Sequence, residues 1–246
     1  MKDLKISIII PLYNEENTII KLLKKIYSLR IANFEIIIVN DGSTDNSLKL
    51  VNDFSKKKKI KIISHEKNIG KGAAIKSAKK FVKGSIIIIQ DADLEYDPKD
   101  YFKLIKPIKE KKYKVVYGSR VLNKIRYNVD GFTSIFRIFG NHLLTEISNL
   151  LNNQNLSDAH TCYKVLTKDI FFNIKLQENG FEFCPELTSK IARLNIEIKE
   201  VPISYRGRNY EDGKKIKLKH AFKAFYTLLK YRFFKWSSKK QNLIST

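Results

Sequence analysis

Three carboxylates lie close together after one short apolar run of the chain. Asp91 and Asp93 follow the run Ser85–Ile89 almost directly, and Glu95 lies two residues further on. Mg²⁺ and Mn²⁺ prefer octahedral shells of oxygen ligands and commonly share them with substrate phosphates. Asp97, which precedes a proline, instead has the pattern of a helix N-cap. Asp91 and Asp93 could be solvated loop residues, but they have no evident structural task, and we predict that they bind Mg²⁺ or Mn²⁺.

The elements that must position these carboxylates alternate along the first half of the chain. Short runs of mostly β-branched or aromatic residues are typical of buried parallel strands, and the longer stretches between them have helical patterns. The expected strands are Ile6–Ile10, Glu35–Val39, Ile60–Ser64, Ser85–Ile89 and Lys114–Tyr117. The expected helices are Glu16–Leu29, Asp45–Lys56, Gly72–Val82 and Pro98–Lys111. The alternation predicts an α/β protein with an open, mostly parallel sheet flanked by helices.

The second half of the chain has a different order of elements. After a polar, basic loop at Ser119–Asp130, helical and strand-like patterns follow one another to a basic amphipathic helix. These elements are expected at Thr133–Leu151, Cys162–Leu166, Pro185–Leu194, Glu197–Val201 and Lys214–Trp236. We therefore divide the chain into an α/β domain (residues 1–213), a basic amphipathic helix (214–236) and a frayed tail (237–246).

A polar cluster follows each of the expected strands of the first half. The clusters are Pro11–Glu15, Asn40–Asp45, Asn68–Gly72, Gln90–Glu95 and Gly118–Arg120. Taken singly, Asp41 and Asp45 could be turn and N-cap residues, and the third cluster could be a simple loop before a helix. Ligands of open α/β sheets bind beyond the carboxyl ends of the strands. Because five clusters meet at that edge, we predict a ligand site there.

The charge of the chain points to an anionic partner. Lys and Arg number 47 against 25 Asp and Glu, a formal net charge of +22. Such an excess attracts nucleic acid, anionic lipid or phosphorylated substrates, although a general bias towards lysine explains it equally well. A nucleic-acid binder would not need the acidic cluster at Asp91–Glu95, so we expect no nucleic-acid partner. Cys162 and Cys184 lack metal-site spacing and are expected to be reduced thiols of the core.

The order of three motifs resembles the family 2 glycosyltransferases of the GT-A fold. The motifs are Pro11-Leu12-Tyr13-Asn14-Glu15, Asn40-Asp41-Gly42-Ser43-Thr44-Asp45 and Asp91-Ala92-Asp93-Leu94-Glu95. Later features resemble the polyprenol-phosphate (dolichol-phosphate) mannosyl- and glucosyltransferases of that family. These features are Gly118-Ser119-Arg120, Arg137 on a helix, Asp158–Lys164, Gly180–Glu186 and Val201–Arg206. The likeness covers the chain from about Lys5 to about Lys230.

The resemblance implies roles for individual residues. The implied donor-binding residues are Pro11, Tyr13, Glu15, Asp41, Lys71, Asp91 and Ala92. Asp93 and Glu95 are the implied direct metal ligands, with Asp91 near the metal or the ribose; relatives often carry Gln at the position of Glu95. Guanidinium groups suit phosphate oxygens, and the implied acceptor-phosphate ligands are Arg120, Arg137, Lys164, Arg208 and Lys214. The implied catalytic residues are Asp158, Arg120 and Arg137.

The resemblance also implies a reaction, in which a hexose leaves a UDP- or GDP-linked donor by direct displacement with inversion. A dolichyl or undecaprenyl phosphate acceptor is already anionic at neutral pH and can attack without a base. The alternative acceptor, a hydroxyl of a glycan or polysaccharide, would need a positioned base. Asp158 resembles a position that could take this role, and it could equally cap a strand or orient Lys164.

The sequence indicates peripheral attachment to a membrane rather than a membrane-spanning helix. No stretch approaches the roughly 18 apolar residues that span a bilayer, so we expect a cytoplasmic protein that is peripheral at the membrane. In the helix at Lys214–Trp236, apolar residues recur at helical spacing between lysines. They are Leu218, Phe222, Phe225, Leu229 and Trp236. Either these residues pack inward and the basic face is solvated, or the helix lies on an anionic membrane surface.

Overall fold

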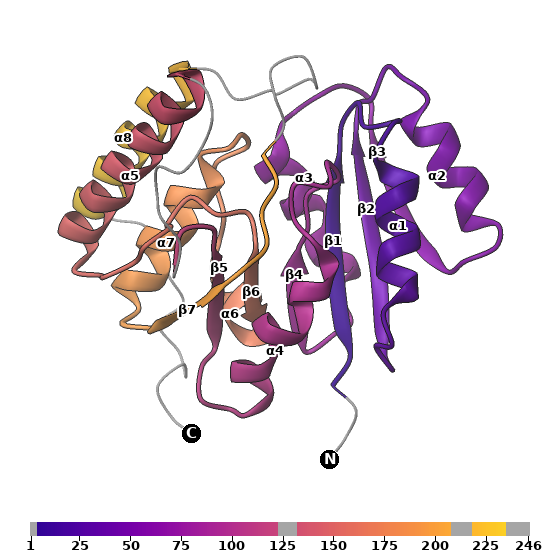
Figure 1. Cartoon of the computed structure of the whole chain (residues 1–246), viewed down its shortest axis with the longest axis horizontal. Helices are drawn as coiled ribbons and strands as arrows, with labels where there is room; N and C mark the ends of the chain where they lie inside the picture. Colours follow the sequence, from indigo (N-terminus) through magenta and orange to yellow (C-terminus); the bar gives the residue numbers. More distant parts are fainter. Residues whose placement is uncertain (1–3, 123–131, 208–217, 235–246) are drawn as a thin grey trace.

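The computed structural model describes residues 4–122, 132–207 and 218–234, without the side chains of 132–138 and 218–220. In this part of the chain, seven strands form one sheet in the order β3-β2-β1-β4-β6-β5-β7 (Figure 1). The strands are β1 (Ile6–Leu12), β2 (Phe34–Asp41), β3 (Ile60–His65), β4 (Ile86–Ile89), β5 (Val115–Ser119), β6 (Lys164–Thr167) and β7 (Ile198–Pro202). All pairs are parallel except those of β6, which runs antiparallel to both β4 and β5.

Helices cover both faces of the sheet. They are α1 (Ile19–Ser28), α2 (Ser47–Ser55), α3 (Lys71–Ala78), α4 (Tyr101–Lys109), α5 (Phe132–Asn152), α6 (Lys168–Asn173), α7 (Phe183–Arg193) and α8 (Leu218–Phe233). One core joins α1, α2 and α4 to the sheet, and the other joins α3, α6 and α7 to the opposite face. Successive residues of β1 therefore enter different cores, Ile8 and Ile10 the first and Ile9 the second, because strand side chains alternate between faces.

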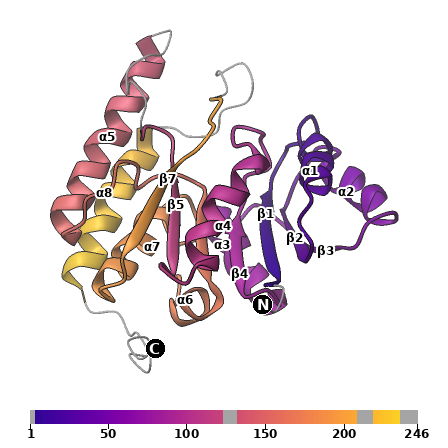
Figure 2. The same ribbon diagram turned by 60° about the horizontal axis from the view of Figure 1, so that its bottom comes forward.

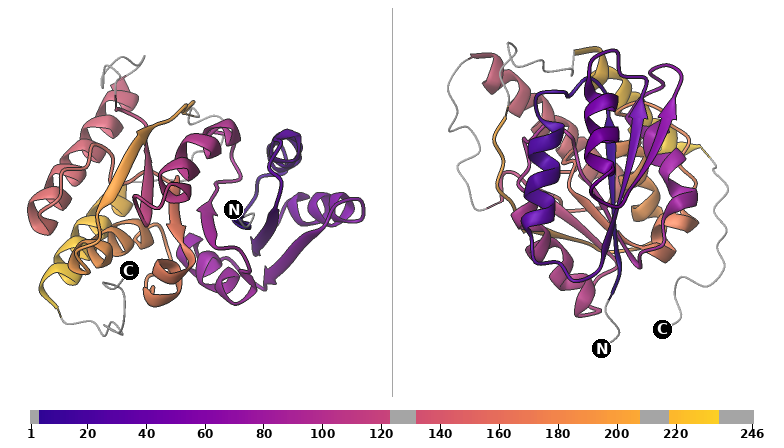
Figure 3. Two further views of the ribbon diagram at one scale, coloured as in Figure 1. Left: turned by 90° about the horizontal axis from the view of Figure 1, so that it is seen from below. Right: turned by 90° about the vertical axis from the view of Figure 1, so that its right-hand side faces the viewer.

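The last helices lie at the β7 end of the sheet. Figures 1, 2 and 3 show α5 and α8 side by side there, with α1 and α2 at the opposite end. Both α5 and α8 also contact α7, so α8 packs on the body of the protein. None of the described helices is long and apolar enough to cross a membrane.

The predicted open, mostly parallel sheet with flanking helices is confirmed. The Asp97 N-cap is also confirmed, since its carboxylate accepts a hydrogen bond from the backbone N–H of Lys99 at 3.0 Å. The predicted helix Gly72–Val82 is instead α3 followed by a 3₁₀ turn at Lys79–Phe81. The division into residues 1–213, 214–236 and 237–246 stays a prediction, because much of the last two segments lies outside the described residues.

Candidate active site

The loops after β1 and β2 are fastened to each other at the carboxyl edge of the sheet. Asn14, in a left-handed conformation with φ of 51°, donates its backbone N–H to Ser43 Oγ at 3.1 Å. Its side-chain oxygen accepts from the backbone N–H of Thr44 at 2.8 Å. The backbone N–H of Glu15 donates to Ser47 Oγ at 2.8 Å. The first two predicted motifs are therefore joined by hydrogen bonds where β1 and β2 end, at the upper edge of the sheet in Figure 1.

Asp41 holds the loop that leads into α3. Its buried carboxylate, 3% exposed, accepts the backbone N–H groups of Ile69 at 3.0 Å and Gly70 at 2.8 Å. The same carboxylate faces His65 Nδ1 at 2.7 Å. Gly42 follows with a φ of 68°, and a Cβ there would lie 2.4 Å from the backbone of Lys67. Asp41 therefore has a structural task, which is to hold the loop before α3 in place.

Lys71, the first residue of α3, reaches the acidic cluster. Its ammonium forms an ion pair with the carboxylate of Asp91 and donates to Cys162 Sγ at 2.9 Å. Burial alone would lower the pKa of Lys71, but the charge of Asp91 raises it above its ordinary value. Lys71 is therefore a fixed positive charge at the edge of the sheet, where a diphosphate group of a ligand would be attracted.

The three carboxylates after β4 point to different partners. Asp91 contacts Lys71, whereas Glu95 Oε2 accepts from the hydroxyl of Tyr205 at 3.0 Å. Asp93 Oδ1 accepts from the backbone N–H of Glu95 at 3.1 Å, across a turn in which Leu94 has a φ of 62°. Among the described residues, no three His, Cys, Asp or Glu side chains come together as a metal cluster. Carboxylate oxygens are nevertheless the type of ligand that Mg²⁺ and Mn²⁺ prefer.

Arg120 and Asp158 form a buried pair beyond β5. Arg120 Nε and Nη2 donate to the two carboxylate oxygens of Asp158 at 2.7 and 2.8 Å. Burial alone would raise the pKa of Asp158, but the charge and hydrogen bonds of Arg120 lower it below its usual value. The guanidinium lies 5.2 Å from the ring centre of Tyr205. Two predicted catalytic residues are thus brought together, and Asp158 is held as an anion that orients Arg120.

Lys164 lies close enough to the Arg120–Asp158 pair for its charge to lower the pKa of Asp158, but its own side chain is buried. It is fully buried in β6, its ammonium donates to the carbonyl of Ala159 at 2.9 Å, and it sits 3.6 Å from the ring centre of Tyr117. Desolvation lowers its pKa. These contacts give no support to the predicted role of Lys164 in acceptor binding. Of the other predicted phosphate ligands, Arg208, Lys214 and the side chain of Arg137 lie outside the described residues.

The remaining predicted donor residues line the same edge. Pro11 is half-buried at the end of β1, and Tyr13 is half-buried in the loop that follows. Glu15 is 7% exposed and accepts from Thr18 Oγ1 at 2.9 Å. Ala92 is buried, at 4% exposed, between the two aspartates. The structure therefore brings the predicted donor residues to one edge of the sheet.

Tyr205 is a site residue that no sequence pattern singled out. Its hydroxyl contacts Glu95 and its ring lies against Arg120, so it joins the acidic cluster to the Arg120–Asp158 pair. A β-bridge between Tyr96 and Tyr205 fixes this position. The sequence feature that could have identified Tyr205 is the run Val201–Arg206. This run resembles the family but contains no acidic or metal-binding pattern.

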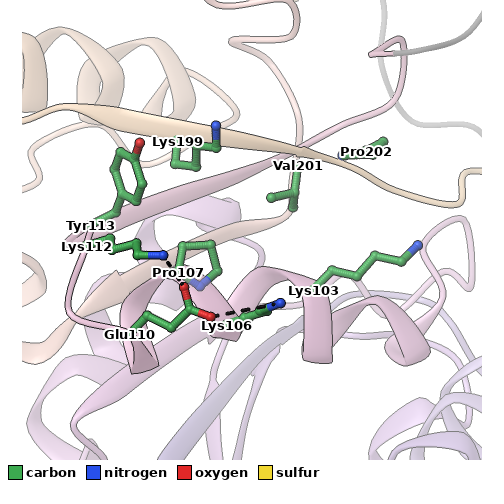
Figure 4. Close-up of a pocket in the computed structure, with 9 residues that line it drawn as sticks. All are labelled: Lys103, Lys106, Pro107, Glu110, Lys112, Tyr113, Lys199, Val201 and Pro202. Carbon is green, nitrogen blue, oxygen red and sulfur yellow. Dashed lines mark ion pairs between the residues drawn. The ribbon is translucent and has the colours of Figure 1, made fainter.

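A cavity of about 490 Å³ lies elsewhere, between α4 and β7 (Figure 4). Its lining residues are Lys103, Lys106, Pro107, Glu110, Lys112, Tyr113, Lys199, Val201 and Pro202. Glu110 pairs with Lys112 at 2.9 Å and with Lys106 at 3.9 Å. None of these residues belongs to the five polar clusters, so this cavity is separate from the candidate active site.

Comparison with known proteins gives consistent matches. The model of the family described as Glycosyl transferase family 2 matches residues 7–174. A UDP-N-acetylglucosamine–dolichyl-phosphate N-acetylglucosaminyltransferase of Methanococcus voltae is 30% identical, over 93% of this chain and 96% of its own. A dolichyl-phosphate beta-glucosyltransferase of Trichomonas vaginalis is 29% identical, over 93% of this chain and 73% of its own. The dolichol-phosphate mannosyltransferase of Pyrococcus furiosus is 27% identical, over 98% of this chain and 67% of its own.

A solved structure of the same fold is glucosyl-3-phosphoglycerate synthase from Mycobacterium tuberculosis. Its complex with Mn²⁺, UDP and glucosyl-3-phosphoglycerate superposes with a TM-score of 0.71 and covers 95% of this chain and 82% of its own. A further complex of that synthase contains Mg²⁺ and UDP and has a TM-score of 0.68. The sequence identity is 18% in both cases, which supports the GT-A fold.

Proposed function

Because this chain belongs to glycosyl transferase family 2, we propose that it transfers a hexose from a nucleotide-sugar donor to a polyprenyl phosphate at the cytoplasmic face of a membrane. The observation that carries the choice of acceptor is the Arg120–Asp158 pair. Asp158 is held ionised by three hydrogen bonds from Arg120, two from the guanidinium and one from the backbone N–H, so it is a poor base for a sugar hydroxyl. A phosphate acceptor is already an anion and needs no base.

Donor binding is proposed at the edge formed by the loops after β1, β2 and β4. Asp41 fixes the loop before α3, and Lys71 at its end supplies a positive charge for the donor diphosphate. The proposed donor is linked to UDP or GDP; among the relatives, the Methanococcus voltae enzyme is named for UDP-N-acetylglucosamine. Direct displacement at this edge would invert the anomeric centre, so an α-linked donor would give a β-linked product.

The proposed cofactor is Mg²⁺ or Mn²⁺. When bound, such an ion supplies Lewis-acid stabilisation for the departing diphosphate. Asp93 and Glu95 are the residues that would hold it, with Asp91 close by. The ion pair between Lys71 and Asp91 places one positive charge next to these carboxylates. This lysine thereby balances the acidic cluster until donor and ion are present.

The acceptor phosphate is proposed to bind at Arg120. Asp158 occupies Nε and Nη2 of its guanidinium, which leaves Nη1 with no hydrogen-bond partner among the described residues. The fixed orientation favours binding because the guanidinium loses little freedom when the phosphate arrives. Arg137, Arg208 and Lys214 remain sequence-based proposals for the same phosphate.

An assay of lipid product tests this function. Purified protein is incubated with a radiolabelled UDP-hexose or GDP-hexose, with dolichyl or undecaprenyl phosphate, or with the matching polyprenol that lacks phosphate. We expect label in the organic phase only with the polyprenyl phosphate, because the phosphate oxygen is the nucleophile. Transfer of label to an added oligosaccharide, with none to lipid, would instead establish the glycan hydroxyl as the acceptor.

Membrane attachment is proposed through the outer face of α8. Phe222, Phe225, Tyr226 and Phe233 are 71%, 41%, 65% and 70% exposed. The face that packs on the protein consists of Ala224, Thr227, Leu228 and Tyr231. Phe222 and Phe225 of the predicted apolar stripe thus lie on the solvent side and are not the packing face. Neighbouring α5 exposes Phe139, Leu143 and Leu150, and exposed apolar side chains on two adjacent helices are typical of an interfacial surface.

We expect the protein to co-sediment with anionic liposomes at low salt and to detach as salt rises, since charges are screened over about 8–10 Å. Replacing Lys215, Lys217, Lys219 and Lys223 with Gln should weaken partition by about fivefold per lysine, because each contributes about 1 kcal/mol near an anionic surface. Lys215, Lys217 and the side chain of Lys219 lie outside the described residues, so this set is chosen from the sequence. The matched control replaces the exposed run Lys56–Lys59 at the opposite end of the molecule with Gln. Equal losses in both variants would show attraction by net charge rather than attachment through α8.

A further inference from the structure

The first turn of α3 is capped by a distant part of the chain. The backbone N–H of Gly72 donates to the carbonyl of Gly180 at 3.2 Å, and that of Ala73 donates to the carbonyl of Asn179 at 2.9 Å. Among the described residues no side chain caps this helix. The first N–H groups of a helix lack partners within it, so here the loop between α6 and α7 (residues 174–182) satisfies them. Lys71 begins this turn, and its backbone position therefore depends on that loop.

Close packing shows how tightly this loop fits against α3. A Cβ at Gly70 would lie 2.5 Å from the carbonyl oxygen of Asn179, and one at Gly72 would lie 2.5 Å from that of Glu178. Lys76 adds hydrogen bonds to the carbonyl of Gln177 at 2.8 Å and to the Asn179 side chain at 2.5 Å. Movement of the α6–α7 loop would therefore be transmitted to the start of α3.

A buried carboxylate in α7 holds the loop from the other side. Glu186 is fully buried, and its two oxygens accept the backbone N–H groups of Gln177 at 2.6 Å and Glu178 at 2.8 Å. Lys190 donates to the same carboxylate at 2.5 Å and to the carbonyl of Lys175 at 2.6 Å. The backbone of the loop is thus anchored on α7, and the side chain of Glu178 is directed elsewhere.

Helix α8 completes the arrangement through Glu178. Lys230 Nζ donates to Glu178 Oε1 at 2.8 Å, and the hydroxyl of Tyr231 lies 2.9 Å from both that oxygen and Gln177 Oε1, two acceptors that share its one hydrogen. Arg193 of α7 donates to the carbonyl of Tyr231 at 2.8 Å. A continuous series of hydrogen bonds therefore runs from α8 through the α6–α7 loop to the first turn of α3, where Lys71 contacts Asp91.

We propose that Glu178, Lys230 and Tyr231 are positioning residues for donor binding, which act by holding Lys71 in place through the α6–α7 loop. The inference rests on the proposed function, in which Lys71 attracts the donor diphosphate. It gives α8 a second task beside membrane attachment, because the inner side of the helix holds the donor site while its outer side faces away from the protein.

The test combines amide hydrogen exchange with nucleotide binding in the full chain. The variants are Lys230→Met, Glu178→Gln and Tyr231→Phe, with Lys230→Arg as the conservative replacement. We expect faster exchange in a peptide covering residues 70–76 for the first three variants, because the Gly72 and Ala73 amides lose their fixed acceptors. We also expect weaker binding of UDP with Mn²⁺, or of GDP if wild type prefers it, by about 2- to 30-fold. Lys230→Arg should restore both readouts.

The control is Arg232→Met, which removes the same charge from an exposed position of α8 and should leave both readouts unchanged. In steady-state assays the three variants should raise the donor KM and leave the acceptor KM unaltered. Variants that bind nucleotide as tightly as wild type, or that leave exchange at residues 70–76 unchanged, would overturn the positioning role. Failure of wild type itself to bind either nucleotide would instead contradict the proposed function.

Discussion

Replacing Asp93 with alanine should lower kcat/KM for sugar transfer at least about a hundredfold, because a Lewis-acid metal is worth several kcal/mol in the transition state. The fold should persist, since Asp93 is half-exposed on a loop after β4. A chelator should likewise abolish activity in wild type, and Mg²⁺ or Mn²⁺ should restore it. Steady-state kinetics and a thermal melt of each variant measure these effects.

The matched control for Asp93 is Asp97, four residues further along the same loop. Asp97→Ala removes the N-cap contact to Lys99 and should cost about 1 kcal/mol of stability while keeping activity. Undiminished turnover of wild type in excess chelator would contradict the metal role. Loss of activity in both aspartate variants would point to damage of the loop rather than to loss of a metal ligand.

Removing one partner of the Arg120–Asp158 pair should have the second large effect. Asp158→Leu leaves a guanidinium buried without its anion, and breaking such a pair typically costs about 3–5 kcal/mol of unfolding free energy. For a chain of this size the melting temperature should fall by about 10 °C. Arg120→Met combined with Asp158→Leu should recover most of that stability, because neither charge is then left alone. Activity should stay low in the double variant, since the proposed phosphate ligand is absent.

The same pair sets a dependence of stability on pH. Arg120 lowers the pKa of Asp158 in the folded state, whereas an unfolded Asp titrates near about 3.9. Its contribution is therefore present above about pH 4 and is lost as the pH falls through the lower, folded-state value. Wild type should lose this part of its stability in acid. In chemical denaturation, the free energy of unfolding of the double variant should change less between about pH 5 and pH 2 than that of wild type.

The sequence predicted the first half of the fold well because its signals are local. The strands β1 to β5 are apolar runs that lie between helices with clear periodicity, and each was expected within a few residues of its observed bounds. The antiparallel direction of β6 could not be read from four residues that begin with a lysine. Helix α6 has six residues, too few for a helical period to stand out.

The chemistry of the site was more predictable than its contacts. The acidic cluster identified a metal-binding edge, but nothing local showed that Lys71 would pair with Asp91, 20 residues away. Arg120 and Asp158 are 38 residues apart, and their pairing follows from the position of β6 beside β5. Lys164 lies in a motif that resembles the family, yet the sheet around it buries the side chain completely. Such outcomes depend on tertiary packing, which single-sequence patterns do not contain.

The insertion of β6 between β4 and β5 also constrains how the chain is made. On the ribosome, β4 emerges as four consecutive isoleucines with only β1 available as a neighbour. Strand β5 does not cover its open side, because within the described sheet β5 pairs with β6 and β7. One edge of β4 therefore stays unpaired until synthesis has passed Thr167. An unpaired apolar edge is a template for aggregation. We therefore expect the nascent chain to be most prone to aggregation over this interval, between the emergence of β4 and the arrival of β6.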